Sequence, residues 1–364
     1  MNIRVKKTNL LGIPAAIGAA LGLLGHSTAG AHHSANALYE MDSDFEIAGE
    51  VTEVRWNNPH VRVVMQVVDD GETQEWIVEG GDSSSMRARG VPGGLVEVGD
   101  SVRAAGRQGR RGKTAIFATN LLLADGREIL MNAEAPPRWS DDIVGRSGGE
   151  MESVIPRRED ASSGIFAVWS APPGFDGDVE AGIWGGDIEL TPEAAAIRDQ
   201  FDPSADADNP FISCTRGIPE IMTGLGPLEF VDQGDHLLFR FQEFDIVRPI
   251  MMGPDAEANR PPKSQIGAHG DVGYSTGYWE DDGTLVVRTT GMSFPYYDQS
   301  GLPQTPDAEL VERWTLMDEG NELRYELTVT DPGTFVRPVV QAKTWHWAPN
   351  RQIEPFNCDP VQEL

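Results

Sequence analysis

The sequence predicts an all-β (mainly β) protein, a small five-stranded barrel followed by a larger antiparallel β-barrel or sandwich with one short helix. First, 40 Gly and 25 Pro in 364 residues indicate many turns and few long helices. Second, short alternating or Val-rich runs recur between turn signals such as Asp281-Asp282-Gly283. Third, the one convincing helix signal covers residues 191–201, where Thr191 precedes Pro192 as a helix cap.

The first 31 residues have the three-part layout of a secretory signal peptide. Arg4, Lys6 and Lys7 precede an apolar stretch over residues 10–24, and the small residues Ala29-Gly30-Ala31 follow it. An uncleaved anchor is the alternative, but the apolar stretch is shorter than the roughly 20 residues that span a bilayer. We expect cleavage after Ala31 and a periplasmic or secreted location. Losing three cations and no anion would take the formal charge from −28 to −31.

The acidic balance restricts the partners that the protein can have. The chain holds 29 Lys and Arg against 57 Asp and Glu, whereas proteins that coat nucleic acid need clustered cations to neutralise phosphates. The chain is not a disordered acidic tail, because 40% of its residues are hydrophobic. We therefore expect a folded exported protein with no nucleic-acid partner and no stable membrane insertion after cleavage. The sequence does not predict the oligomeric state.

Residues 32–131 predict one small antiparallel barrel. Strand patterns cover residues 47–56, 61–68, 73–78, 96–106 and 114–123. Asp69-Asp70-Gly71 is a hairpin signal between the second and third of these, and residues 83–89 predict a short helix capped by a serine. Three strands, a short helix and two further strands are typical of an OB-like five-stranded barrel.

The remaining chain divides into a linker and a larger domain. Residues 132–165 are rich in Pro and mixed charges without a sustained period, so they predict a surface linker. Residues 166–364 predict the larger β-barrel or sandwich. Its clearest strand patterns cover residues 236–244, 273–279, 285–290, 310–316 and 323–330.

Two cysteines remain in the exported chain. They are Cys214 and Cys358, and their even number is consistent with a disulfide. Oxidising compartments let disulfides persist. A bridge between them would tie the end of the chain to the start of the second domain. A pair of buried free thiols is the alternative.

The predicted cleavage site contains the strongest candidate for chemistry. Cleavage after Ala31 would make His32 the new N-terminus, with His33 beside it. An N-terminal amine and the imidazole of the same residue can chelate copper, and one further imidazole completes a T-shaped set of three nitrogen ligands. His60 is the favoured third ligand, because Pro59 ends a strand and fixes the backbone before it. The alternative is a mobile terminus, with His60 as a hydrogen-bonded turn residue.

A cluster of cations stands out in the acidic chain, on the predicted hairpin between the fourth and fifth strands. Its members are Arg103, Arg107, Arg110, Arg111 and Lys113. In an OB-like barrel this hairpin borders the usual ligand groove, so the cluster could bind an anionic ligand, a glycan carboxylate or an acidic face of the second domain. A solvated hairpin that balances local charge is the alternative.

The second domain combines aromatic and polar residues that could bind a small organic or sugar ligand. The candidates for ligand binding are Tyr274, Trp279 and Arg313, although such aromatic residues also serve as barrel core. Whether the protein is an enzyme is left open. For acid–base catalysis the candidates are His346, Asp331 and Glu280.

Two phrases carry a resemblance. Ala31-His32-His33-Ser34 and Trp56-Asn57-Asn58-Pro59-His60, followed by Val98-Gly99-Asp100, resemble a family of exported bacterial proteins of unknown function. Their mature chains open with Ala-His-His-Ser and contain Trp-x-Asn-Pro-His. The resemblance covers residues 31–130 and implies a periplasmic or secreted small barrel without an assigned activity. On the matching positions it directs attention to His32, His33, Trp56, Asn58 and His60, with Trp56 and Asn58 as ligand-binding candidates.

The rest of the chain is similar to a second uncharacterised exported β module, known for a Gly-x-Trp-Glu-Gly-Asp phrase. Here Trp279-Glu280-Asp281-Asp282-Gly283 departs from that phrase by an inserted acidic residue, and the His often found in Gly-His-Ser is Tyr274. The sequence thus predicts a two-domain binding protein. It would hold copper through a mature N-terminal histidine and a small ligand or partner in the second domain. The alternative is an exported enzyme that acts on a small organic substrate in that domain.

Overall fold

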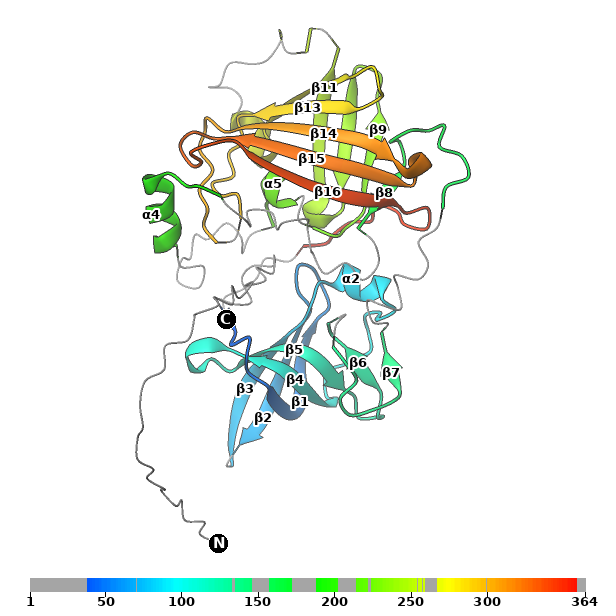
Figure 1. Cartoon of the computed structure of the whole chain (residues 1–364). Coiled ribbons are helices and arrows are strands. Elements are labelled where there is room, and N and C mark those ends of the chain that lie inside the picture. Colours follow the sequence, from blue (N-terminus) through cyan, green and yellow to red (C-terminus); the bar gives the residue numbers. More distant parts are fainter. Residues whose placement is uncertain are drawn as a thin grey trace, which may run out of the picture.

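The structure is a computed structural model, and it places most of the chain in two β-barrels (Figure 1). It describes residues 38–69, 71–132, 135–145, 157–171, 188–201, 214–221, 224–253, 255–256, 258, 267–298 and 300–358. Residues 1–37, with the predicted signal peptide, His32 and His33, lie outside the described residues.

The first barrel has the strand order of an OB fold. Its strands are β1 (Phe45–Arg55), β2 (Arg62–Asp69), β3 (Glu72–Glu79), β4 (Ser101–Gln108) and β5 (Ala115–Leu122). Antiparallel pairing joins β1 to β2, β2 to β3, β1 to β4 and β4 to β5. Parallel pairing of β3 with β5 closes the barrel. The prediction of an OB-like five-stranded barrel is therefore confirmed.

Two short strands extend the first barrel beyond the predicted five. They are β6 (Glu128–Leu130), which pairs with β5, and β7 (Ile143–Val144), which pairs with β6. The two strands lie around the boundary where the sequence predicts a linker without sustained period. Short strands of two or three residues carry no periodicity that sequence reasoning can detect.

Alternation of buried residues explains the first barrel. In β2, the side chains of Val63, Met65 and Val67 are buried while those between them are partly exposed.

Two details of the prediction for this barrel are wrong. The predicted fourth strand is too long, because residues 96–100 form turns and β4 begins at Ser101. The predicted serine cap of helix α2 (Ser83–Ala88) is also wrong, since the Asp82 carboxylate accepts from Ser85 N at 2.7 Å.

The second barrel contains nine strands and is closed. In spatial order they are β8 (Val168–Ser170), β9 (Leu228–Asp232), β10 (His236–Phe241), β11 (Ile246–Met252), β12 (Tyr274–Trp279), β13 (Leu285–Thr290), β14 (Glu309–Met317), β15 (Glu322–Thr330) and β16 (Val339–Trp347). Neighbouring strands pair antiparallel except β11 and β12, which run parallel. β16 pairs with β8 and completes the ring.

Among the described residues, helices are few and short, as predicted. The longest is α4 (Pro192–Gln200), where the Thr191 hydroxyl accepts from Ala194 N at 3.2 Å and so confirms the predicted cap. Besides α2, the other described helices are α5 (Ile218–Ile221), η1 (Arg110–Gly112), η3 (Glu243–Asp245), η4 (Gly267–Val272) and η5 (Asp318–Gly320). Within the described ranges, no helix has the length and apolar character needed to cross a membrane.

The two barrels are joined by the last segment of the chain. Cys214 and Cys358 form a disulfide, which confirms the predicted bridge. Nearby, Glu354 pairs with Arg87 of the first barrel at 2.8 Å, while Phe356 N donates to Asp245 of the second at 2.9 Å. Residues 348–358 therefore contact both barrels, on the side where α2 faces the larger barrel in Figure 1.

Candidate functional site

His60 lies at the end of the first barrel, on the turn that leads into β2. Val61 N donates to Gly81 O at 3.0 Å, and Gly80 N donates to Val61 O at 2.8 Å, which holds the end of β3 against this turn. The Gly80 carbonyl then lies 3.0 Å from Nδ1 of His60. A carbonyl can only accept a hydrogen bond, so Nδ1 carries the proton and Nε2 carries the lone pair of the neutral ring.

A buried carboxylate and a buried phenol lie beside this imidazole. Glu79 Oε1 is 3.5 Å from His60 Nδ1, and Glu79 Oε2 accepts from the Tyr39 hydroxyl. Tyr39 has no exposed surface, and burial followed by the charge of Glu79 holds its pKa far above the ordinary value. Phe117 packs between the two rings, with centroids 5.5 Å from Tyr39 and 6.4 Å from His60. Tyr39 and His60 therefore share one carboxylate and one aromatic neighbour.

The position of Tyr39 bears on the predicted copper site, because Tyr39 follows His33 by six residues. An extended chain spans at most about 3.3–3.6 Å per residue, so His33 can lie up to about 20 Å from Tyr39. His60 lies well within that radius, since Tyr39 and His60 both contact Glu79. Among the described residues, no three His, Cys, Asp or Glu side chains gather as a metal site. A site at His60 would therefore need ligands from residues 1–37.

Asn58 has its side chain fully engaged within the protein. Its Nδ2 donates to Ser84 Oγ at 3.0 Å and to the carbonyl of Phe356, and its Oδ1 accepts from Ser83 Oγ at 2.9 Å. Only 2% of Asn58 is exposed. The motif residue that sequence reasoning offered as ligand-binding thus links the first barrel to the C-terminal segment.

Trp56, the other aromatic candidate of the motif, packs against the hydrophobic core of the first barrel. Its indole also contacts Gly93, where a Cβ would lie 3.1 Å from Trp56 Cδ1. These contacts give Trp56 a packing role at the barrel end.

The predicted cluster of cations binds the segment that precedes β1. Arg110 Nε donates to Tyr39 O at 2.9 Å, and Arg107 Nη1 donates to the carbonyl of Ser43. Arg103 pairs with Glu46 and lies 5.2 Å from the ring centroid of Trp139. Three of the five cations therefore hold their own chain in place, and two of them fix the segment that follows the N-terminal histidines.

The ligand-binding candidates of the second barrel are spread over its surface. Tyr274 donates to Ala256 O at 3.4 Å, and Trp279 is 42% exposed beside Phe166, with ring centroids 6.1 Å apart. Arg313 forms a two-pronged pair with Glu280, at 2.8 and 2.5 Å. The described structure gives these three residues no common partner.

The catalytic candidates do not meet either. His346 Nδ1 lies 3.9 Å from Glu322, at one end of the β15–β16 pair. Asp331 follows the opposite end of β15 and accepts from the Tyr297 hydroxyl at 2.9 Å and from Thr305 Oγ1 at 2.6 Å. Glu280 is held by Arg313, whose side chain donates to it and lowers the pKa of that carboxyl. Each group thus has a separate structural partner.

A G-x-S-x-G string, Gly273-Tyr274-Ser275-Thr276-Gly277, escaped the sequence reasoning. In enzymes this spacing places a serine on a sharp turn between a strand and a helix. Here Ser275 lies within β12, is 1% exposed and shares a hydrogen bond of 2.9 Å with Thr289. The string therefore does not form a nucleophile elbow.

The interior of the second barrel is packed, and its charges are paired. Arg248 and Glu312 have side chains 1% and 0% exposed and form two hydrogen bonds, at 2.6 and 3.2 Å. Cζ of Arg248 lies 4.9 Å from the ring centroid of Phe239, and the ring centroids of Phe230 and Trp314 lie 5.1 Å apart. Sequence reasoning missed this pair, because Arg248 and Glu312 look like solvated residues in alternating strands.

A second buried pair lies at one end of this barrel. Lys343 Nζ donates to Gly224 O and lies 3.7 Å from the ring centroid of Trp345, while Glu243 accepts from Leu225 N at 2.7 Å and from Gly226 N at 2.6 Å. Burial lowers the pKa of Lys343 and raises that of Glu243. Because these partners belong to one loop, the two side chains hold residues 224–226 against the barrel.

The geometry defines a two-barrel β protein with polar residues at the rim of its OB-type barrel. Residues 22–118 match a family of unknown function (DUF6152). The match covers about a quarter of the chain and includes both phrases that carry the resemblance noted in the sequence. Among curated proteins, none matches this chain.

Proposed function

We propose that this protein is an exported two-domain copper-binding protein, whose first barrel holds the ion together with the mature N-terminus. One observation carries the proposal: His60 Nδ1 lies 3.0 Å from the Gly80 carbonyl, beside the Glu79 carboxylate that accepts from Tyr39. Histidine ligands of metals almost always donate their second ring N–H to a carbonyl or carboxylate, which fixes the tautomer and the ring orientation.

In this proposal the ligands come from two parts of the chain. After cleavage behind Ala31, His32 supplies its amine and its imidazole, and His60 supplies Nε2, with His33 as an additional nitrogen donor. These nitrogen ligands suit Cu(II). Bound copper would supply a redox-active cation. The Gly80 carbonyl and the Glu79 carboxylate orient the ring of His60.

The charge of the chain supports this proposal. After cleavage the formal charge would be −31, so the exported protein would attract cations to its surroundings. The second barrel, with its paired and packed interior, is a scaffold in this proposal and carries the disulfide partner Cys214. The alternative of an acid–base enzyme gains no support from His346, Asp331 and Glu280, which have separate partners.

The test has two measurements on protein exported with its native signal. Mass spectrometry of the purified chain should find His32 as the first residue. Cu(II) titration against a competing chelator should then find an affinity at least about tenfold weaker in His60→Ala than in wild type. His236→Ala is the matched control, because His236 lies on β10 beside Asp235 and should leave the affinity unchanged.

Two results would contradict the proposal. A mature terminus beyond His33 would remove the amine and both imidazoles from the site. An affinity in His60→Ala equal to that of His236→Ala would show that His60 is not a ligand.

A further inference from the structure

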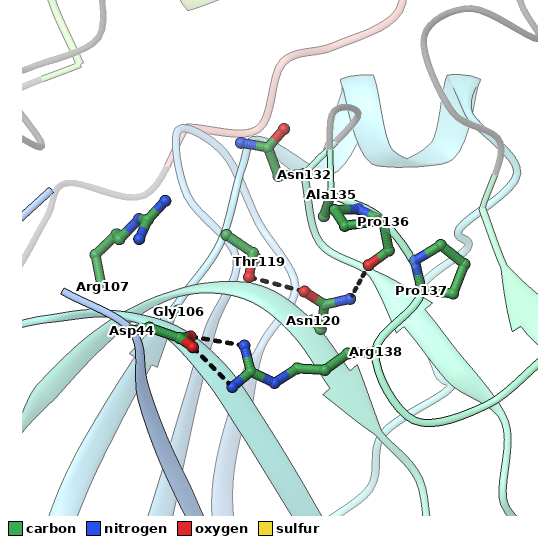
Figure 2. A pocket seen from close by; sticks show the side chains of 10 residues that line it. All are labelled: Asp44, Gly106, Arg107, Thr119, Asn120, Asn132, Ala135, Pro136, Pro137 and Arg138. Carbon is green, nitrogen blue, oxygen red and sulfur yellow. Dashed lines mark hydrogen bonds and ion pairs between the residues drawn. The ribbon is translucent and has the colours of Figure 1, made fainter. Parts of the chain in front are cut away.

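A pocket lies on the first barrel where β4 and β5 meet the segment before β1, and its lining does not include His60. Its volume is about 390 Å³. It is lined by Asp44, Gly106, Arg107, Thr119, Asn120, Asn132, Ala135, Pro136, Pro137 and Arg138. Figure 2 shows the Asp44–Arg138 ion pair along its lower edge, with Arg107 and Asn132 above that pair. The volume is at the small end of the range for ligand pockets, about 300–1,000 Å³, and fits a single small molecule.

An irregularity in the β-sheet creates the floor of this pocket. The register between β4 and β5 shifts between Ala105 and Gly106, so that Thr119 is an extra residue on β5. The Thr119 carbonyl therefore accepts from Met131 N at 2.9 Å and Asn132 N at 3.3 Å, outside the β4–β5 pairing. Gly106 is required here, because a Cβ on it would lie 2.0 Å from the Phe117 carbonyl oxygen.

A buried carboxylate holds the opposite wall. Glu128 has no exposed surface and accepts from the backbone N–H groups of Arg138, Trp139 and Ser140, at 2.8, 2.7 and 2.9 Å. Asn120 connects this carboxylate to the wall, donating to Glu128 at 2.6 Å and to Pro136 O at 2.9 Å. Hydrogen bonds within the chain therefore fix the wall, which lowers the entropy lost when a ligand binds.

The pocket presents both signs of charge and an apolar face. Asp44 accepts from Arg138 at 2.6 and 3.2 Å, yet its side chain remains 67% exposed and can accept further hydrogen bonds. Arg107 gives one N–H, on Nη1, to the Ser43 carbonyl, and the described residues take up none of its other guanidinium donors. The third face is apolar and consists of Ala135, Pro136 and Pro137.

We propose that this pocket binds a free α-amino acid with an apolar side chain. The ligand carboxylate would pair with Arg107, the ammonium group with Asp44, and the side chain would lie against Pro136 and Pro137. A simple anion could pair with Arg107 but would leave the exposed Asp44 carboxylate without a ligand group, and a simple cation would meet Arg107 and Arg138. A zwitterion places a group of opposite charge at both Arg107 and Asp44.

Titration calorimetry on the full chain, with L-leucine as the probe, tests this inference. L-leucine should bind saturably, and N-acetyl-L-leucine and L-leucinamide, which each lack one charge, should bind at least about tenfold more weakly. Arg107→Gln and Asp44→Asn should each weaken L-leucine at least about tenfold. Arg103→Gln is the matched control, since Arg103 lies on β4, pairs with Glu46 and does not line the pocket.

Asp44→Asn is the second variant because Asp44 is largely exposed and its replacement leaves the Arg107–Ser43 contact in place. Absence of saturable L-leucine binding would overturn the inference. Equal binding of N-acetyl-L-leucine would also overturn it, since the pocket would then recognise an anion. Affinities in Arg107→Gln and Asp44→Asn equal to that of Arg103→Gln would place the binding elsewhere. None of these outcomes depends on copper.

Discussion

The two barrels place charged residues differently: the larger one buries an ion pair in its core, whereas Glu128, buried in the smaller one, is held by backbone N–H groups. In the larger barrel, Arg248 and Glu312 are fully buried and neutralise each other among aromatic rings. In the smaller barrel, His60, Glu79 and the pocket residue Arg107 lie at the ends and edges of the strands. The buried pair of the larger barrel lies within its hydrophobic core, whereas polar groups at a rim can meet a ligand. In the proposed function, the small barrel binds the ligand and the large barrel supports it.

The largest expected effect comes from breaking the buried pair of the large barrel. Glu312→Ala leaves the Arg248 charge unpaired in the core, which we expect to lower the free energy of unfolding by about 3–5 kcal/mol. Chemical denaturation of wild type and variant measures this difference. The double variant Arg248→Met and Glu312→Leu removes both charges and should recover most of the stability. Equal stability of Glu312→Ala and wild type would mean that the pair is not buried in solution.

A smaller effect is expected at the junction of the barrels. Asn58→Ala removes the hydrogen bonds to Ser83, Ser84 and Phe356 and leaves their buried groups without that partner, which we expect to cost about 2 kcal/mol. Thermal unfolding followed by circular dichroism measures the change. Asn57→Ala is the matched control, because Asn57 is exposed in the same motif. Identical unfolding of the two variants would remove Asn58 from the junction.

The wall of the pocket should respond to acid. Burial raises the pKa of Glu128, but the backbone N–H groups of Trp139, Arg138 and Ser140 and the Asn120 amide outweigh it and bring the pKa below the ordinary value. As the pH falls, Glu128 is therefore protonated in the unfolded chain before it is protonated in the folded chain. Its ionised form stabilises the fold above the ordinary pKa, and this stability is lost as the pH falls through the lowered pKa.

Glu128→Gln removes the titrating group, so its unfolding free energy should fall less than that of wild type between neutral pH and about pH 3. Urea unfolding at a series of pH values measures the two slopes. Parallel pH profiles of wild type and Glu128→Gln would contradict the assignment of this carboxylate.

The smallest effect is expected on the outside of the large barrel. Arg313→Gln breaks the pair with Glu280, but both groups are partly exposed, with side chains 40% and 32% accessible. Ion pairs in such positions contribute little because water and salt screen them. We expect no measurable change in thermal stability. A marked loss would show that polar groups outside the large barrel matter as much as those within it.

Much of the fold could be predicted from the sequence. The alternation of apolar residues predicts strands such as β2 and β15, and Thr191 before Pro192 predicts the helix cap. The even number of cysteines predicts the disulfide between Cys214 and Cys358. The strands β8, β9, β11 and β16 were not predicted. β8 has only three residues, and β11 contains a proline at position 249, which sequence reasoning takes as a strand breaker.

The candidate site was predicted less completely. His60 was found from its motif, but the roles of Tyr39 and Glu79 depend on contacts between residues 19 and 40 positions apart in the chain. The pocket was not predicted, because a strand irregularity at Thr119 and the burial of Glu128 leave no pattern in a single sequence. Asn58 was taken for a ligand-binding residue, since a motif does not reveal whether its polar atoms already have partners.

The most direct test of the central claim counts the imidazoles bound to copper. Pulsed electron paramagnetic resonance of the Cu(II)-loaded protein detects the remote nitrogen of each coordinated imidazole, which for His60 is the Nδ1 that faces Gly80. We predict that His60→Ala loses the signal of one imidazole while His236→Ala retains the wild-type signal. Identical spectra of wild type and His60→Ala would contradict the assignment of the copper site to the small barrel.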